Sequence, residues 1–371
     1  MVCIVFCKGK LSVLTLNLKD EVFDILNKKN ELFVLSVNYH YICIDNSINF
    51  KKYVIMDKPY VVGMDIGGTN SVFGIVDARG NILSVDSIKT QAYSLFEDYV
   101  AAIAAKLLPM IEAVGGIAKI KGMGIGAPNG NYYTGNIEHS ANLPWKGIVP
   151  LAADFEKTIG VPVTVTNDAN AAAIGEMTYG AARGMKNFIE ITLGTGVGSG
   201  IVVNGQLVYG HDGFAGELGH VISRRQDGRQ CGCGRRGCLE TYCSATGVAR
   251  TAKEFVEYTD EPSLLRDIEG DITSKDVYDA AMRGDKAARE VFAFTGTILG
   301  EALADFIAFS APEAIILFGG LTKAGDLIMK PTYEAMEANV LSIWKGKTKL
   351  LVSELEDADA AVLGASALAW G

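Results

Sequence analysis

The segment Gly216–Glu240 holds the densest group of side chains in this sequence that could do chemistry. One histidine and three cysteines, His220, Cys231, Cys233 and Cys238, supply an imidazole and three thiols. This donor set closes a tetrahedral zinc site and leaves no open coordination position, which is the form of a structural site. The glycines between the cysteines allow the tight backbone curvature that such a site needs. The segment therefore predicts a structural zinc site.

The spacing Cys-x-Cys-x4-Cys argues against other uses of these thiols. The cluster contains no C-x-x-C redox pair, and disulfide frameworks are typical of short secreted chains, whereas this chain has seven cysteines in 371 residues. We interpret the pattern as that of a reducing, cytoplasmic setting. Cys243 lies outside the spacing, and we expect it in the core.

A second candidate group lies in the stretch VTVTNDANAAAIGE, where an apolar strand runs into a helix. Asn167 and Asp168 stand at this junction, and an acid there lies near the positive end of the helix dipole. A carboxylate in such a place can accept the proton of an alcohol that attacks a phosphorus atom. Asp168 is therefore the candidate general base, and Asn167 can both donate to and accept from a neighbouring hydroxyl. The alternative for Asp168 is an ordinary helix N-cap.

Three glycine-rich turns follow predicted strands. The first, Asp65-Ile66-Gly67-Gly68-Thr69-Asn70, joins an acid to two glycines, whose missing Cβ atoms let backbone N–H groups approach an anion. The second contains Gly194, Thr195, Gly196 and Gly198, and the third is Gly319-Gly320. One such turn is more often purely structural, but three at strand ends predict a phosphate-binding cleft. None matches the Gly-x4-Gly-Lys-Ser/Thr loop or a dinucleotide fingerprint.

The elements that must position these residues alternate between strands and helices from Met56 onward. Apolar strand segments such as YVVGMDIGG are followed by a helical pattern across Ser94–Val114, which indicates an α/β fold. The stretch MDIGGTNSVFGIVDARGNIL is echoed about 127 residues later by ITLGTGVGSGIVVNGQLV. Each copy has a strand, a glycine-rich turn, a second strand and a tight hairpin turn. The repeat predicts two similar lobes that face each other across a cleft.

Composition excludes several classes of protein. The net charge of −9 and the pI near 5.1 argue against nucleic acid or an anionic membrane surface as the main partner. We see no run of about 18 apolar residues and no signal peptide, so we expect no membrane partner. A small-molecule ligand fits this composition best.

The first 55 residues differ in composition from the rest of the chain. They contain no alanine and one glycine, whereas the remaining residues hold 41 of the 42 glycines. The stretch beginning at Met56 reads as a natural protein start, so we expect residues 1–55 to come from an upstream start and to lie outside the functional fold. The alternative is a regulatory or DNA-binding arm. Seven lysines against five acidic residues, with no arginine, leave little basic charge for DNA.

The three glycine-rich turns resemble the phosphate-1, phosphate-2 and adenosine turns of the actin-like ATPase superfamily, which includes sugar kinases and heat-shock chaperones. The resemblance implies a two-lobed, ribonuclease H-like α/β fold with ATP and Mg²⁺ in the cleft between the lobes. We place the N-terminal lobe at 56–177, completed by a C-terminal helix at 358–371. The C-terminal lobe, with the zinc motif, is placed at 178–357.

The segment Gly216–Glu240 resembles the signature of the ROK family (repressor, open reading frame, kinase), with Gly-His followed by Cys-x-Cys-Gly-x-x-Gly-Cys-x-Glu. The resemblance implies a set of sugar-contacting residues, which by motif are Asn142, Asn167, Asp168, Glu217, His220 and Glu240. Asn142 lies in SANLPWKG, where the tryptophan directly follows the proline, unlike the family's Asn-x-Pro-x-Trp-like loop. His220 would be shared, with one ring nitrogen on zinc and the other on a sugar hydroxyl.

The stretch GCLETYCSATG resembles ROK glucokinases more than ROK fructokinases. This implies ATP-dependent phosphorylation of glucose at the 6-hydroxyl, with a homo-oligomer, a dimer or tetramer, as in many ROK kinases. Mannose or an N-acetylhexosamine is the first alternative, and a sugar-responsive ROK repressor is the second. The extension lacks two short helices joined by a glycine turn, and the intact turn at Asp65–Asn70 favours a kinase. An ATP-splitting chaperone would not explain the Asn-Asp pair or the cysteine cluster.

Overall fold

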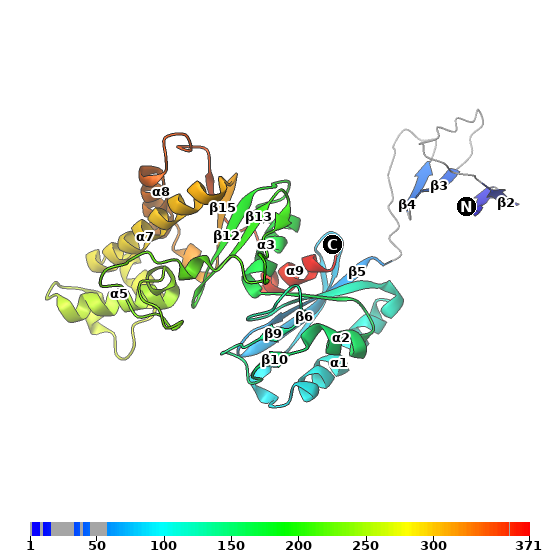
Figure 1. Cartoon of the computed structure of the whole chain (residues 1–371), viewed down its shortest axis with the longest axis horizontal. Coiled ribbons are helices and arrows are strands. Elements are labelled where there is room, and N and C mark those ends of the chain that lie inside the picture. Colours follow the sequence, from blue (N-terminus) through cyan, green and yellow to red (C-terminus); the bar gives the residue numbers. More distant parts are fainter. Residues whose placement is uncertain (1, 8–9, 16–32, 38–39, 45–57, 356) are drawn as a thin grey trace. The chain divides into compact units, whose positions relative to one another are not determined.

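The computed structural model describes residues 2–7, 10–15, 33–37, 40–44, 58–355 and 357–371, in two compact units, Met1–Pro59 and Tyr60–Gly371 (Figure 1). In the first unit the described residues form two antiparallel hairpins, β1 (Val2–Cys7) with β2 (Lys10–Thr15), and β3 (Phe33–Val37) with β4 (His40–Ile44). The boundary expected after residue 55 falls within 45–57, outside the described residues, and stays a prediction.

The first sheet of the second unit has five strands in the order β11-β8-β5-β6-β7. Its strands are β5 (Tyr60–Ile66), β6 (Asn70–Asp77), β7 (Ile82–Lys89), β8 (Ile120–Gly126) and β11 (Val163–Thr166). Strands β5, β6 and β7 form an antiparallel meander, whereas β8 and β11 run parallel to β5. The sheet is accompanied by helices α1 (Phe96–Ala113) and α2 (Leu151–Ile159), the short strands β9 (Ile137–Glu138) and β10 (Ile148–Val149), and the 3-10 turns η1 (Thr90–Ala92) and η2 (Ile117–Lys119).

Helix α1 covers this sheet with one apolar face. Tyr99, Ile103, Leu107 and Ile111 recur every four residues and are buried, which is the periodicity that predicts a helix in this part of the sequence. Trp145 packs 4.5 Å from the ring of Tyr99 and is 6% exposed, so it is a core residue.

The second sheet repeats the topology of the first, in the order β14-β13-β12-β15-β16. Its strands are β12 (Phe188–Leu193), β13 (Val197–Val203), β14 (Gln206–Leu207), β15 (Ala314–Phe318) and β16 (Lys349–Val352). Strands β12, β13 and β14 are antiparallel, and β15 and β16 run parallel to β12. The predicted internal repeat is confirmed, since β5 and β12 occupy the same place in their sheets.

The second sheet carries most of the helices. They are α4 (Glu240–Cys243), α5 (Ala245–Tyr258), α6 (Ser274–Met282), α7 (Lys286–Ser310) and α8 (Asp326–Asn339), with the 3-10 turns η3 (Leu218–His220), η4 (Leu264–Asp267) and η5 (Gly320–Ala324). Cys243 is fully buried among them, as expected.

Helix α7 is long and apolar enough, by length and composition, to cross a membrane, and the sequence analysis did not single it out. In the structure 67% of its most apolar window is buried. Side chains such as Phe292, Leu299 and Leu303 fill the core of this half of the unit. Burial therefore accounts for the apolar composition of the helix.

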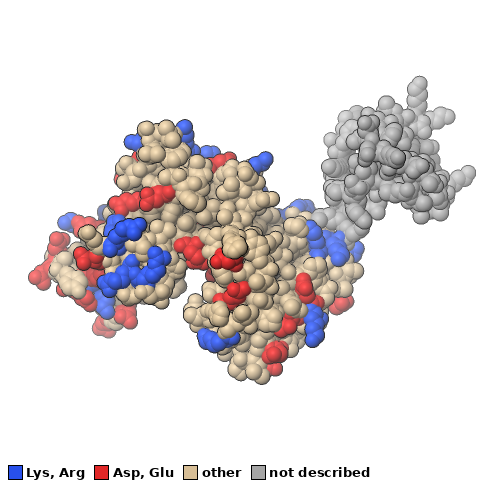
Figure 2. Space-filling view, viewed as in Figure 1, with Lys and Arg blue, Asp and Glu red and all other residues tan. Residues whose placement is uncertain are grey.

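Helices α3 (Asp168–Thr178) and α9 (Asp357–Leu368) lie between the two sheets (Figure 1). Helix α9 lies directly on β5 and β8, because a Cβ atom on Gly63 would meet the Val362 carbonyl at 2.1 Å, and one on Gly124 would meet the Ala365 carbonyl at 1.9 Å. Figure 2 shows acidic and basic side chains interspersed on this face of the unit, and a notch between its halves with acidic side chains nearby.

Candidate active site and cysteine cluster

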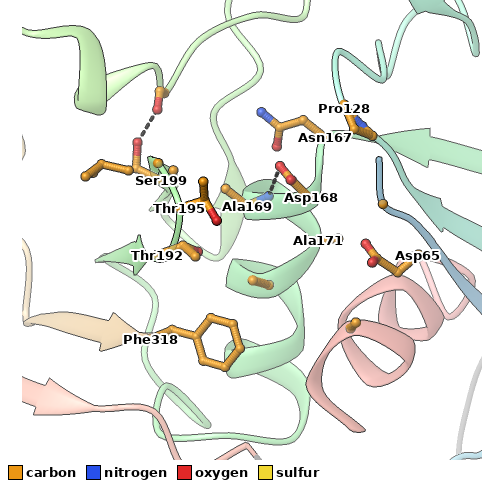
Figure 3. A pocket seen from close by; sticks show the side chains of 18 of the residues that line it. Asp65, Pro128, Asn167, Asp168, Ala169, Ala171, Thr192, Thr195, Ser199 and Phe318 are labelled. Atoms are coloured by element: carbon orange, nitrogen blue, oxygen red, sulfur yellow. Dashed lines mark hydrogen bonds between the residues drawn. The ribbon is translucent and has the colours of Figure 1, made fainter. Parts of the chain in front are cut away.

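A cavity of about 800 Å³ is lined by residues from both halves of the second unit. It brings together most of the site residues predicted from the sequence, which are Asp65, Gly67, Gly68, Asn142, Asn167, Asp168, Gly194, Thr195, Gly196, Gly198, Glu217, His220 and Glu240. Figure 3 shows Asp65 and Asp168 near each other on one side of this space, with Phe318 at its far end. Residues more than 170 positions apart in the sequence thus share one site.

The other predicted nucleotide residues do not line the cavity. The carbonyl of Asn70 accepts from the Gly67 N–H at 2.9 Å, and the carbonyl of Thr69 accepts from the Thr90 N–H at 2.9 Å. These bonds shape the first turn. Gly319 and Gly320 follow the lining residue Phe318 without lining the cavity themselves.

Gly319 has a φ of 101° that only glycine adopts easily. A Cβ atom there would lie 2.7 Å from the Leu193 carbonyl, so the glycine lets the end of β15 lie against the end of β12.

Asn167 and Asp168 have different roles at the start of α3. Asn167 is the N-cap, and its side-chain oxygen accepts from the Asn170 N–H at 2.7 Å. The alternative that Asp168 is the N-cap is therefore wrong. Asp168 is the first residue of the helix, and its Oδ1 accepts from the Ala169 N–H at 2.8 Å (Figure 3). The side chain stays exposed to the cavity, which leaves an oxygen available to a ligand.

Asp65 is the penultimate residue of β5 and lies close to Asp168. A Cβ atom on Gly126 would lie 3.5 Å from the Asp65 carboxylate and 3.6 Å from the Cα of Asp168, so the two acids converge on this glycine. Burial, helped by the negative charge of Asp168, raises the pKa of Asp65 to about 7. A nearby cation would relieve this repulsion and favour the ionised form.

Glu217, His220 and Glu240 form a polar wall of the cavity, and Asn142 also lines the cavity. Burial raises the pKa of Glu217; the nearby His220 counteracts this, whereas the charges of Asp168 and Glu240 add to it. Asn142 packs against the first glycine turn, since a Cβ atom on Gly68 would lie 3.3 Å from the carbonyl oxygen of Asn142. This wall offers several hydrogen-bonding groups to an uncharged polyol.

The cysteine cluster lies behind His220. One ligand atom from each of His220, Cys231, Cys233 and Cys238 lies within 4.8 Å of all the others. The Cys233 and Cys238 sulfurs are 3.7 Å apart, and the Cys231 sulfur is 3.8 Å from Nδ1 of His220. A tetrahedral zinc ion with Zn–S bonds of about 2.3 Å requires donor separations of about 3.8 Å. The donor types and spacing therefore fit zinc.

A buried arginine that the sequence analysis missed fixes the loop carrying this cluster. Arg229 is 7% exposed, and its guanidinium lies 4.5 Å from the centre of the Tyr242 ring. It pairs with Glu254 at 2.5 Å and donates to the Thr241 carbonyl at 2.8 Å. The loop is thus attached to α4 and α5 independently of any metal. The strongly polar QDGRQ stretch around Arg229 gives no sign of its burial in the sequence.

Contacts between the halves of the unit, beside the cavity, were also missed. Tyr132 stacks on Tyr209 with ring centroids 3.9 Å apart, and the Tyr133 hydroxyl donates to the Gly210 carbonyl at 2.8 Å. Asn131 donates to the Asp212 carbonyl at 2.7 Å. The preceding segment, Gly124–Gly130, reaches the cavity, which its Pro128 and Asn129 line.

A fully buried acid, Glu190, lies in the middle of β12. Its Oε1 accepts from the hydroxyl of Thr192, a cavity-lining residue, at 2.8 Å. Burial raises the pKa of Glu190 well above its usual value. A glutamate inside the apolar strand FIEITL is the signal that could have drawn attention to it.

Two sheets of one topology, helices between them and glycine turns at the ends of β5 and β12 define a two-lobed ATPase of the actin-like class. The sequence matches the model of the ROK family over residues 61–371, so this chain belongs to the ROK family.

Members of this family resemble the chain over most of its length. It is 38% identical over 317 residues to a glucokinase of Halalkalibacterium halodurans, covering 83% of this chain and 94% of the relative. A ROK family glucokinase from Streptomyces griseus, solved in complex with glucose and AMPPNP, matches with a TM-score of 0.68 at 34% identity, covering 83% of this chain and 98% of that one. A xylose repressor of Caldicellulosiruptor bescii is 30% identical over 251 residues, which is 67% of this chain and 62% of the repressor.

Proposed function

We propose that this protein is an ATP-dependent glucokinase that transfers the γ-phosphoryl group of ATP to the 6-hydroxyl of glucose. The observation that carries the proposal is the exposed carboxylate of Asp168, held at the start of α3 in a cavity shared by the glycine turns and the Glu217–His220–Glu240 wall. The similarity to two glucokinases, one of them solved with glucose and AMPPNP, supports this reading.

Asp168 acts as the general base. Its Oδ1 is held by the Ala169 N–H, so the carboxylate keeps one orientation, and it accepts the proton of the sugar hydroxyl as that oxygen attacks the γ-phosphorus. Asn167 binds a neighbouring hydroxyl through its amide. Catalysis of this kind depends mainly on positioning and on neutralising the phosphate charge.

The nucleotide lies on the turns at Asp65–Asn70, Gly194–Gly198 and Gly319-Gly320. The first two turns line the cavity and offer backbone N–H groups to the phosphates, apart from those of Gly67, Gly194 and Val197, which already donate within the protein. The third turn borders the adenosine, and Asp65 attracts the Mg²⁺ that accompanies ATP. The raised pKa of Asp65 supports this assignment, because an acid that is costly to ionise alone gains most from a nearby cation.

The cysteine cluster binds one structural zinc ion through His220, Cys231, Cys233 and Cys238. A zinc ion held there would supply no chemistry to the reaction and would fix the ring of His220, whose Nδ1 lies 3.8 Å from the Cys231 sulfur. The other ring nitrogen, Nε2, then faces a sugar hydroxyl from a fixed direction. Glu217, Glu240 and Asn142 make the other contacts to the sugar ring.

The domain bounds, cellular location, oligomeric state and partners are proposed from the family and the composition. Residues 1–55 lie outside the functional fold, and the lobes are 56–177 with 358–371, and 178–357. The protein works in the cytoplasm as a homo-oligomer, without nucleic acid or membrane partners. A repressor role is less well supported, because the match covers 62% of the xylose repressor but 94% of the glucokinase.

A sugar panel tests the proposed function. ATP consumption by the purified chain is measured with glucose, mannose, fructose, N-acetylglucosamine and N-acetylmannosamine. We expect the highest kcat/KM for glucose. A higher kcat/KM for an N-acetylated sugar would make that sugar, and not glucose, the preferred substrate. The absence of sugar-dependent ATP consumption would refute the kinase assignment.

A further inference from the structure

Glu240 contacts the second glycine turn as well as the polar wall of the cavity. Its Oε2 accepts a hydrogen bond from the backbone N–H of Val197 at 3.0 Å. Gly196 leaves room for this carboxylate, because a Cβ atom there would lie 2.4 Å from the same oxygen. The acceptor is charged, which makes the bond stronger than one between neutral groups. Glu240 therefore holds the middle of the turn.

The start of α5 holds the same turn at two further points. The Ala245 N–H donates to the Gly194 carbonyl at 2.8 Å, and the Thr246 hydroxyl donates to the Thr195 carbonyl. These bonds come from residues just after Glu240 in the sequence. The turn is thus bound along one side by the segment that follows the last cysteine of the cluster.

The cysteine cluster lies directly beside Glu240. Its other oxygen, Oε1, lies 3.8 Å from the sulfur of Cys231. Cys238 is two residues earlier in the chain, and its carbonyl accepts from both the backbone N–H and the hydroxyl of Thr241. Because Glu240 lies beside one sulfur and two residues from another, we expect a displacement of these sulfurs to shift its carboxylate.

We propose that Glu240 is a positioning residue for the nucleotide turn, in addition to its proposed contact with the sugar. Through Glu240, the binding or loss of metal at the Cys/His cluster changes the order of that turn. The inference rests on the proposed function, since it takes Gly194–Gly198 as a nucleotide site. A turn with three glycines is costly to order, and Glu240 orders it before the nucleotide arrives.

The test measures the Kd of MgADP in the absence of sugar, by calorimetry on the full chain. Glu240→Ala removes the acceptor, and Glu240→Gln keeps an oxygen in its place. Glu217→Ala is the matched control, because Glu217 belongs to the same wall but none of the hydrogen bonds among the described residues joins its carboxylate to the turn.

We expect Glu240→Ala to weaken MgADP binding about tenfold or more, as the loss of a hydrogen bond to a charged group does. Glu240→Gln should stay within about threefold of wild type, and Glu217→Ala should weaken MgADP binding much less than Glu240→Ala does. Equal MgADP affinities in wild type and Glu240→Ala would overturn the inference. Failure of the wild-type chain to bind MgADP would instead refute the nucleotide site itself, and the inference with it.

Metal removal from folded protein with 1,10-phenanthroline tests the second half of the proposal. Thermal unfolding confirms that each variant is folded. Metal loss should weaken MgADP binding in wild type but have little further effect in Glu240→Ala, since both changes remove the same contact. Equal weakening in both proteins would show that Glu240 does not transmit the state of the cluster.

Discussion

Replacing Asp168 with asparagine removes the proposed proton acceptor and little else. The amide has the same shape as the carboxylate, and its oxygen can still accept from the Ala169 N–H, which Asp168 binds at 2.8 Å. The N-cap of α3 is Asn167, so the helix keeps its cap. We therefore expect the Asp168→Asn protein to fold and to bind glucose with a Kd within about threefold of wild type.

The loss of turnover should be large. A positioned general base contributes about 10²–10⁴-fold to the rate, which corresponds to about 2.7–5.4 kcal/mol of barrier. The substitution also removes a negative charge that raises the pKa values of Asp65 and Glu217, so nucleotide binding should not weaken.

A coupled assay of ADP formation gives kcat for this variant, and calorimetry gives the glucose affinity. Asn167→Ala is a useful contrast, because it removes the N-cap and a proposed sugar contact. That variant should lose about 1 kcal/mol of stability and raise KM more than it lowers kcat. A kcat for Asp168→Asn within tenfold of wild type would refute the assignment of Asp168 as base.

Three further predictions concern the cluster, the buried acid and the extension. Cys233→Ser should abolish the binding of one zinc ion per chain and raise the KM for glucose by about tenfold or more; elemental analysis that still finds one zinc per chain would count against the site. The pKa of Asp65 rises from 3.8 to about 7 in the native state, so the protonated form is favoured there and the free energy of unfolding should fall as pH rises from about 4 to 7, by up to about 4 kcal/mol. Denaturant titrations should show that Asp65→Asn removes this decrease, and an identical pH dependence in both proteins would contradict it. Deletion of residues 1–55 should leave kcat and KM unchanged, whereas an inactive or insoluble truncation would make the extension part of the functional fold.

The repeated topology could be predicted because it depends on local patterns. Asp65 and Thr192 occupy the same place in two copies of a strand, turn and strand unit, and each copy shows its glycines and hairpin turn in the sequence. The helix expected at Ser94–Val114 is observed at Phe96–Ala113, a difference confined to its ends.

Which of Asn167 and Asp168 caps the helix could not be predicted in the same way. Both residue types are favoured N-caps, so the sequence leaves two registers for the start of α3. The structure selects one of them, because the Asn167 side chain reaches the Asn170 N–H.

Contacts between distant segments were beyond the sequence analysis. The stack of Tyr132 on Tyr209 and the bond from Val197 to Glu240 join residues that share no local pattern. Arg229 is polar and lies in a polar stretch, so nothing in its neighbourhood predicts a buried guanidinium. The roles of such residues can be recognised only in the folded structure, where each residue contacts a partner that is distant in the sequence.

The most direct test of the account is the position of the phosphate on the product. The purified full chain is incubated with glucose, ATP and Mg²⁺, and the product is analysed by correlation of phosphorus and proton resonances. The account predicts that phosphorus couples to the two protons on carbon 6. Phosphate on another carbon, or no phosphorylated glucose at all, would contradict it.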